Sequence, residues 1–245
     1  MNYLKIIQTE LRKFSSDERK RSNEWFFKTG PGEYGEGDEF IGVSVPDIRT
    51  VARKYRSVEL ETVAGLMSSP IHEERMLGVI ILVEKYERAQ GVEERKRLLD
   101  FYLVHFAGVN NWDLVDASAH KILGAYALES KAGEKLLLHY ARSESVWERR
   151  LAIVGTFALI KNGRFDLTLK IANMLLKDTH DLTHKAVGWM LREVWKKNVE
   201  GAKRCEAFLC AHYRKIPRTT LRYAIERMEE GKRKKFLNGE CKEFL

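Results

Sequence analysis

Segments in which apolar residues are interspersed with strong helix formers recur along most of the chain. The longer of these predicted helices cover residues 72–86, 112–128, 146–160, 183–195 and 218–228. Shorter predicted helices lie between them at 93–107, 134–141, 165–176 and 201–213. One or two further helices are predicted in the first 27 residues, and another at 47–55, with Pro46 as its first residue.

The predicted helices repeat with a nearly constant period. Asp116 and Arg150 are 34 residues apart, Arg150 and Lys185 are 35 apart, and Ala186 and Leu221 are 35 apart. Paired helices that recur every 34–40 residues are typical of HEAT or armadillo solenoids, in which stacked pairs bury one continuous core. We therefore predict an all-α fold, a right-handed α-α superhelix of HEAT-like repeats with a concave basic groove. A plain helical bundle is the alternative.

Few residues interrupt this pattern. After Pro70 the next proline is Pro217, so 146 residues lie between them without a proline. We expect a single helical-repeat domain over 1–245, with N-terminal helices at 1–27, a Gly-rich loop at 28–45, repeats at 46–228 and a basic tail at 229–245.

Composition narrows the class of protein. The chain carries 43 Lys and Arg against 35 Asp and Glu, a net charge of +8, and its hydrophobic and charged fractions are 44% and 32%. It is too apolar for a disordered chain and too charged for a membrane protein. The N-terminal residues lack the apolar core of a signal peptide. Three cysteines (Cys205, Cys210 and Cys241) argue against a disulfide framework, and we expect a reduced cytoplasmic protein.

The Gly-rich loop contains a G-x-G-x-x-G pattern at Gly30, Gly32 and Gly35. A nucleotide-binding loop needs a strand before it, a helix directly after it and exposed amides in a non-acidic setting. Acidic residues that would repel a phosphate crowd this loop: Glu33, Glu36, Asp38 and Glu39. We therefore predict a structural turn.

Trp112 and Asp116 are four residues apart, so on a helix they share a face, while Leu114 and Val115 point to the core. This spacing holds a carboxylate next to a π-surface, which is one arrangement of a reactive site. The alternative is structural, with Asn111 or Asp113 capping the helix and Trp112 packing against neighbours.

The equivalent positions in the next two repeats carry Arg150, then Lys185 with Trp189 four residues further on. If the repeat register holds, these residues line one groove together with Trp112 and Asp116. Taken singly, Arg150 is better explained by a salt bridge and Trp189 by core packing beside Gly188. Their convergence on equivalent positions favours a site.

Positive charges suit a phosphate-bearing partner for this groove. The candidates for binding these phosphates are Lys185, Arg149, Arg218 and Arg222. For the basic run at 232–235 a solvated surface is the better explanation.

Two metal-like patterns are weak. HDLTH at 180–184 resembles a zinc motif, but it has Asp in place of Glu and no third ligand, and Asp181 or Thr183 looks like a helix cap. Cys205 and Cys210 have no matching Cys/His pair, so we expect packed thiols and no metal.

Three motifs together resemble the AlkD-like DNA alkylation repair enzymes, which are HEAT-like-repeat alkylpurine DNA glycosylases. The motifs are NWDLVD at 111–116, WERRLAI at 147–153 and KAVGWMLRE at 185–193. FIGVSVP at 40–46 is similar to the family's N-terminal region, and the loop at 29–38 looks like a variant in one branch of it. The likeness runs over residues 20–228, in the right order and spacing.

The resemblance implies catalytic roles for Asp116, Trp112, Trp189 and Arg150. It implies hydrolysis of the N-glycosidic bond of N3- or N7-alkylated purines in double-stranded DNA, with the lesion left largely in the base stack. We expect a monomer without a cofactor. The alternatives are a non-catalytic module that binds DNA structure or a protein through the same face, and a peptide-binding solenoid.

Overall fold

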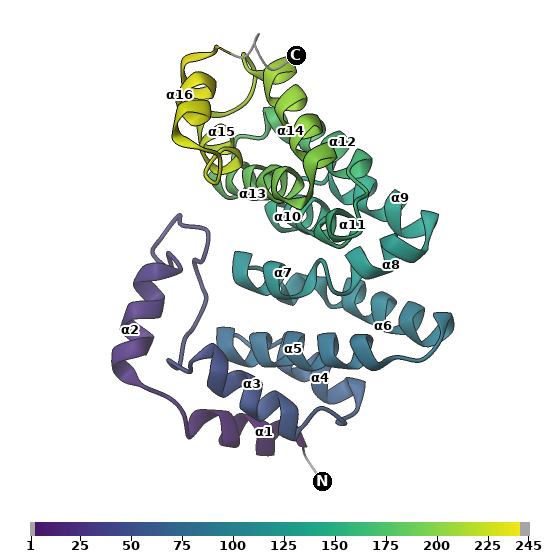
Figure 1. Ribbon diagram of the computed structural model, residues 1–245. Helices are drawn as coiled ribbons and strands as arrows, with labels where there is room; N and C mark the ends of the chain where they lie inside the picture. Colours follow the sequence, from purple (N-terminus) through teal and green to yellow (C-terminus); the bar gives the residue numbers. More distant parts are fainter. Residues whose placement is uncertain (1–2, 241–245) are drawn as a thin grey trace. The chain divides into compact units, whose positions relative to one another are not determined.

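The computed structural model describes residues 3–240, and its regular secondary structure in this range consists of helices (Figure 1). Over these residues no β-strand forms, and one isolated parallel bridge joins Glu39 and Ile71. None of the helices in this range is both long enough and apolar enough to cross a lipid bilayer. The prediction of an all-α fold is confirmed.

The chain divides into two compact units, residues Met1–Ser118 and Ala119–Leu245. The helices of the first unit are α1 (Tyr3–Arg12), α2 (Asp17–Phe26), α3 (Val45–Lys54), α4 (Leu60–Met67), α5 (His72–Arg88), α6 (Val92–Val104), the short 3-10 helix η1 (Phe106–Gly108) and α7 (Trp112–Ser118). Helix α5 is the centre of this unit, since α3, α4, α6 and α7 all pack against it. Every residue from His72 to Val83 is buried, as expected of a helix that is covered all round.

Helix α13 has the same central place in the second unit. The helices are α8 (Leu123–Glu129), α9 (Lys131–Tyr140), α10 (Val146–Gly155), α11 (Phe157–Lys161), α12 (Asp166–Met174), the 3-10 helix η2 (Leu175–Lys177), α13 (Asp181–Lys197), α14 (Val199–His212), α15 (Arg218–Ala224) and α16 (Glu230–Asn238). Helices α10, α11, α12, α14 and α15 pack against α13. Its apolar face, with Met190, Leu191 and Val194 fully buried, lies in the core of the unit.

The predicted repeat is visible in both units. Helices α5, α7, α10, α13 and α15 begin at residues 72, 112, 146, 181 and 218, so successive starts are 34 to 40 residues apart. Within each unit the successive members pack on one another, α5 with α7, and α10 with α13 and α13 with α15. The superhelical twist and its handedness stay predictions.

Two of the predicted long helices are interrupted. The helix expected at 112–128 stops at Ser118 and resumes at Leu123, and the one expected at 146–160 breaks at Thr156, whose hydroxyl donates to the carbonyl of Ile153 over 2.7 Å. A Cβ on Gly124 would lie 2.2 Å from the carbonyl oxygen of Gly155, so α8 and α10 touch through their backbones here. Such close contacts leave no local sign in the sequence.

Other boundaries also differ from the prediction. Helix α4 was not expected, and its weak sequence signal has two causes: Glu59 makes no capping bond, and Gly65 lies inside the helix. Pro46 is the second residue of α3, because Ser44 caps the helix and Val45 opens it. Part of the predicted basic tail forms helix α16, which buries Phe236 completely. Residues 241–245, including Cys241, lie outside the described residues.

The contact between α13 and α15 depends on Gly188. A Cβ at this position would lie 2.5 Å from Cβ of Tyr223 and 2.6 Å from the carbonyl oxygen of Thr220. Although alanine favours helix more than glycine does, we expect Gly188→Ala to lower the free energy of unfolding by about 1–3 kcal/mol through overpacking. Urea denaturation measures this change. Gly231→Ala in the exposed first turn of α16 is the control, and a loss there as large as at Gly188 would argue against overpacking as the cause.

Candidate functional site

Helix α7 begins at the first predicted site residue. The buried side chain of Asn111 accepts a hydrogen bond from the amide of Trp112 over 2.8 Å, and Asp113 accepts one from the amide of Leu114 over 2.9 Å. Both predicted capping residues therefore bond to amides of the first turn. Leu114 and Val115 are fully buried, as predicted.

Trp112 is half-buried against an aromatic cluster of the first unit. Its ring stacks on Phe27 with centroids 5.4 Å apart and planes 20° apart, and Phe26 meets it edge-on at 5.9 Å. Phe27 also lies against Phe40 and the imidazole of His72, at 5.1 and 4.9 Å. The indole is therefore held in one orientation by groups from other elements.

Asp116 lies one helical turn after Trp112 and is also half-buried. Four residues of separation on α7 put the carboxylate and the indole on the same face. The structure thus brings these two predicted residues together.

Arg150, Lys185 and Trp189 belong to the second unit. Arg150 on α10 is only 5% exposed, and its guanidinium donates to the carbonyl oxygen of Leu182 on α13 over 2.8 Å. Lys185 and Trp189 follow on the same helix, with Lys185 2.8 Å from the carboxylate of Asp181. The structure therefore links Arg150 to the helix that carries Lys185 and Trp189. Convergence of these residues with Trp112 and Asp116 stays a prediction.

Trp189 is half-buried rather than fully enclosed in the core. Its ring centroid lies 6.0 Å from that of Phe157, which in turn meets His120 edge-on at 5.4 Å. The ammonium of Lys161 lies over the Phe157 ring, 4.6 Å from its centroid. Like Trp112, Trp189 belongs to an aromatic cluster, and it is partly accessible.

The predicted DNA-binding residues differ in their surroundings. Arg149 is engaged inside the second unit, because its Nε lies 2.5 Å from the carboxylate of Asp178 and its Nη1 donates to the carbonyls of Ser143 and Glu144. Burial would raise the pKa of Asp178, but Arg149 and the amide of His180 hold it below its ordinary value. Arg218 and Arg222 are exposed on α15.

The weak metal motifs have structural roles. His180, rather than Asp181 or Thr183, caps α13 by accepting a hydrogen bond from the amide of Leu182 over 3.2 Å, and His184 bonds to the carbonyl of Asp178 over 2.6 Å. No group of three or more His, Cys, Asp or Glu side chains within residues 3–240 could hold a metal ion.

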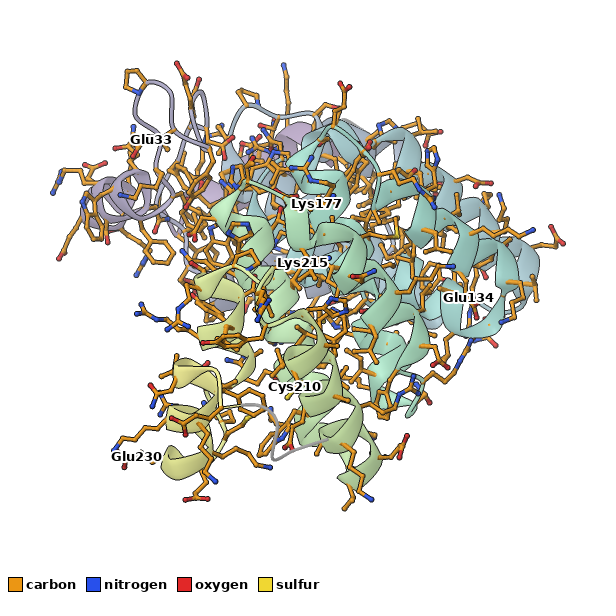
Figure 2. The ribbon with its side chains drawn as sticks, turned by 90° about the horizontal axis from the view of Figure 1, so that it is seen from above. Glu33, Glu134, Lys177, Cys210, Lys215 and Glu230 are labelled. Carbon is orange, nitrogen blue, oxygen red and sulfur yellow. The ribbon has the colours of Figure 1, made fainter. Side chains whose placement is uncertain are left out.

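Neither of the two described cysteines forms a disulfide bond. Cys205 is buried and donates to the carbonyl of Leu191 over 3.3 Å, and burial raises the pKa of its thiol. Cys210 is half-buried on α14 (Figure 2). Cys205 is therefore the packed thiol that the sequence predicts.

Backbone amides of the Gly-rich loop donate hydrogen bonds to carboxylates of the same loop. The amide of Gly30 donates to Glu33 over 3.0 Å, and that of Gly32 donates to Glu36 over 2.9 Å. Figure 2 shows Glu33 on this loop, outside the helices. Because carboxylates already occupy these amides, the prediction of a structural turn in place of a phosphate-binding loop is confirmed.

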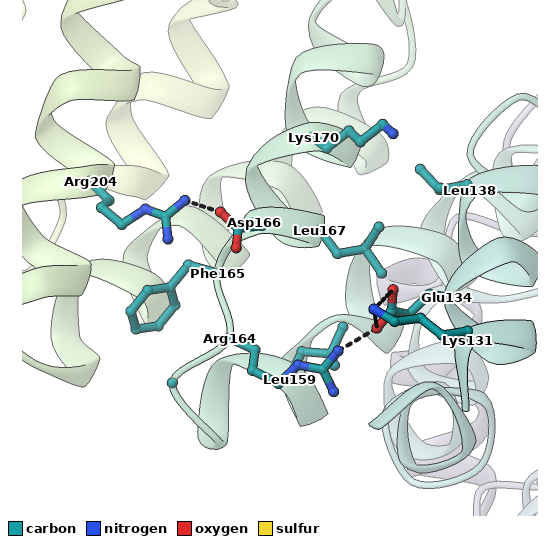
Figure 3. A pocket seen from close by; sticks show the side chains of 11 residues that line it. Lys131, Glu134, Leu138, Leu159, Arg164, Phe165, Asp166, Leu167, Lys170 and Arg204 are labelled. Atoms are coloured by element: carbon teal, nitrogen blue, oxygen red, sulfur yellow. Dashed lines mark hydrogen bonds and ion pairs between the residues drawn. The ribbon is translucent and has the colours of Figure 1, made fainter. Parts of the chain in front are cut away.

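A cavity of about 390 Å³ lies in the second unit, away from the predicted site residues (Figure 3). Three of the four positive side chains that line it, all but Lys170, are paired with acidic ones of the same cavity. Lys131 and Arg164 both bond to Glu134, and Arg204 bonds to Asp166. Because most of these charges pair with one another, we interpret this cavity as a network of ion pairs between helices and not as a candidate site.

The sequence did not indicate a buried polar hub at the start of α5, formed by His72, Glu73, Glu74 and Arg75, each at most 4% exposed. Glu73 accepts the amides of residues 41–43, and Glu74 accepts bonds from Gln8 and Ser69 and pairs with Arg12. The signal that could have found this hub is the run of four polar residues directly before the apolar stretch at 76–83.

Comparison with known proteins identifies the family. The family model described as "DNA alkylation repair enzyme" matches residues 7–228. A solved structure described as a predicted DNA alkylation repair enzyme from Enterococcus faecalis has a similar fold, with a TM-score of 0.68 at 16% identity over 88% of this chain and 97% of that one. No curated protein matches the chain. The match over nearly the whole length shows that the chain belongs to the DNA alkylation repair enzyme family.

Proposed function

We propose that this protein is a monofunctional DNA glycosylase that releases positively charged N3- or N7-alkylated purines from duplex DNA by hydrolysing the N-glycosidic bond. Membership of a DNA alkylation repair family supports a role in DNA repair. The observation that carries the finer proposal is the half-buried Asp116 carboxylate, one turn from an indole that a cluster of aromatic rings holds in place.

The chemistry suits this pair of side chains. An N3- or N7-alkylated purine carries a positive charge and is already a good leaving group, so the enzyme needs no general acid, unlike an ordinary glycosidase. Departure of the base leaves an oxocarbenium-like deoxyribose. Asp116 stabilises that cation and orients or deprotonates the attacking water.

The remaining predicted residues bind and orient the DNA. Trp112 and Trp189 pack on the sugar and attract the cation through their π-faces. Arg150 holds a backbone phosphate near the lesion, and Lys185, Arg218 and Arg222 supply positive charge along the duplex. Of the candidates, Arg149 has the weakest case, because its donors are already engaged with Asp178 and two backbone carbonyls.

Incubation with methylated duplex DNA, followed by chromatography of the released bases, tests the proposal. We expect release of 7-methylguanine or 3-methyladenine at a rate above spontaneous depurination, by a monomer that needs no added cofactor. Binding to DNA without any release would favour the alternative, a non-catalytic repeat module. A binding affinity that does not change with salt concentration, together with no response to DNA, would favour a peptide-binding solenoid.

Loss of either indole should slow base release. A cation–π contact is worth about 1–2 kcal/mol when desolvated, so Trp112→Ala and Trp189→Ala should each lower kcat/KM by about tenfold. Single-turnover release from methylated DNA measures this effect. Trp25→Ala, at a 75% exposed tryptophan on α2, is the matched control. Equal losses in all three variants would argue against specific roles for Trp112 and Trp189.

A further inference from the structure

One side chain of the Gly-rich loop, Asp38, is turned inward, and it is only 4% exposed. Its carboxylate accepts hydrogen bonds from three groups of other elements. The bonds come from Nδ1 of His72 at 3.2 Å, the guanidinium of Arg75 at 2.6 Å and the side-chain amide of Asn111 at 3.1 Å. The loop therefore connects α5 with the segment that begins α7.

The imidazole of His72 lies between two carboxylates. Asp38 faces Nδ1, and Asp113 of α7 faces Nε2 at 2.9 Å, while the ring itself is 3% exposed. Because ionised carboxylates only accept hydrogen bonds, both ring nitrogens must donate, which requires the imidazolium form. Burial and the positive charge of Arg75 lower the pKa of His72, but Asp113 and Asp38 outweigh them and raise it to about 9.

Asp38 and His72 bond to the two residues that flank Trp112, Asn111 and Asp113. Asn111, which bonds to Asp38, also accepts the amide of Trp112, and Asp113, which bonds to His72, accepts the amide of Leu114. The ring of Phe27 lies against both His72 and Trp112. The backbone and the indole of Trp112 are thus tied to the same buried bridge.

We propose that Asp38 and His72 are positioning residues for the reaction: the Asp38–His72–Asp113 bridge fixes the first turn of α7, and with it the Trp112 indole and the Asp116 carboxylate. This inference rests on the proposed glycosylase function. Buried charges of this kind contribute little net stability compared with apolar packing, but they do impose one geometry. The Asp116 carboxylate needs such a fixed position to stabilise the cation that develops in the transition state.

The glycines of the loop fit the same role. Gly37, directly before Asp38, has a φ of +85°, which residues with a side chain rarely adopt. A Cβ on Gly35 would lie 2.3 Å from the carbonyl oxygen of Phe27, so only glycine lets the loop pass this close to the end of α2. Gly35, the last glycine of the G-x-G-x-x-G pattern, and Gly37, which follows it, thus let the loop bring Asp38 inward.

The first test compares Asp38→Asn, Asp113→Asn and the double variant, all shown by circular dichroism to be folded at the assay temperature. Each single variant is expected to lower kcat for base release at least tenfold, with the Kd for methylated duplex changed less than twofold. Because both act through one bridge, the double variant should lose about as much as either single one, and not the product of the two losses. Glu33→Gln, which neutralises a carboxylate that accepts a hydrogen bond within the loop, should retain the wild-type kcat.

The second test needs no substitution, so it holds even if the variants fail to fold. His72 is titrated in the wild-type protein by NMR of its ring nitrogens, and kcat is measured over the same pH range and corrected for spontaneous base loss. We expect kcat to fall with the midpoint at which His72 loses its proton. A constant kcat while His72 deprotonates, or folded Asp38→Asn with the wild-type kcat, would overturn the positioning role. Absence of base release by the wild type would instead overturn the proposed function.

Discussion

Asp116→Asn is expected to lower kcat for release of methylated purines at least a hundredfold while leaving the Kd for methylated duplex DNA unchanged. The amide has nearly the shape of the carboxylate but no charge, so it cannot stabilise the sugar cation or take a proton from water. Removal of one preorganised group that stabilises charge in a transition state costs on the order of 10²–10³ in rate, or about 3–4 kcal/mol.

The measurement is single-turnover release of 7-methylguanine, with DNA affinity measured separately by fluorescence anisotropy. Asp100→Asn, at an exposed carboxylate on α6 that pairs with Lys96, is the control within the same unit. A parallel loss of affinity and rate in Asp116→Asn would point to a structural role, and full activity would remove this carboxylate from the mechanism.

The helices of the chain could largely be predicted from the sequence, because proline is absent between Pro70 and Pro217 and the long helices recur with a regular period. Local pattern cannot show where a helix breaks. Thr156, for example, interrupts a continuous helical pattern through its own hydroxyl, beside a contact between the backbones of α8 and α10.

The site was predictable to the extent that it depends on local spacing. Trp112 and Asp116 share a face because they are four residues apart on a helix. Asn111 and Asp113, the predicted caps, each bond to the amide of the next residue in the chain. Lys185 and Trp189 lie on one helix for the same reason.

Asp38 shows what local spacing cannot reveal. In the sequence it is one of several acidic residues in a Gly-rich loop, and its neighbours Glu33 and Glu36 bond to amides of the loop. Its own partners, His72 and Asn111, lie 34 and 73 residues further along the chain. Only the packing of the loop against α5 and α7 distinguishes an inward carboxylate from exposed ones.

The bridge should also make the stability of the first unit depend on pH in the alkaline range. The pKa of His72 is raised from its ordinary value of 6.5 to about 9 in the folded protein, so the imidazolium contributes its full stability below about pH 6.5. That contribution is lost as the pH rises through about 9. With a ring only 3% exposed, solvent screening is slight, and the shift corresponds to about 3 kcal/mol.

A comparison of the wild type with His72→Gln tests this prediction. The difference in their free energies of unfolding should shrink by about 3 kcal/mol between pH 6 and pH 10, because only the wild type loses a proton from the bridge. Urea denaturation at each pH, combined with amide exchange of α5 and α7, assigns the change to the first unit. A difference that stays constant over this range would show that His72 is not held as an imidazolium.

His212 on α14 supplies a control of opposite sign. Burial, with a smaller contribution from Lys215, lowers its pKa, so the folded state disfavours the charged imidazole and stability at this position rises with pH through the unfolded value. His212→Gln should therefore remove a loss of stability at acid pH and leave the alkaline range unchanged. Opposite responses at two histidines of one chain would trace the alkaline loss to the carboxylates around His72, since a general effect of pH on the protein would move both in the same direction.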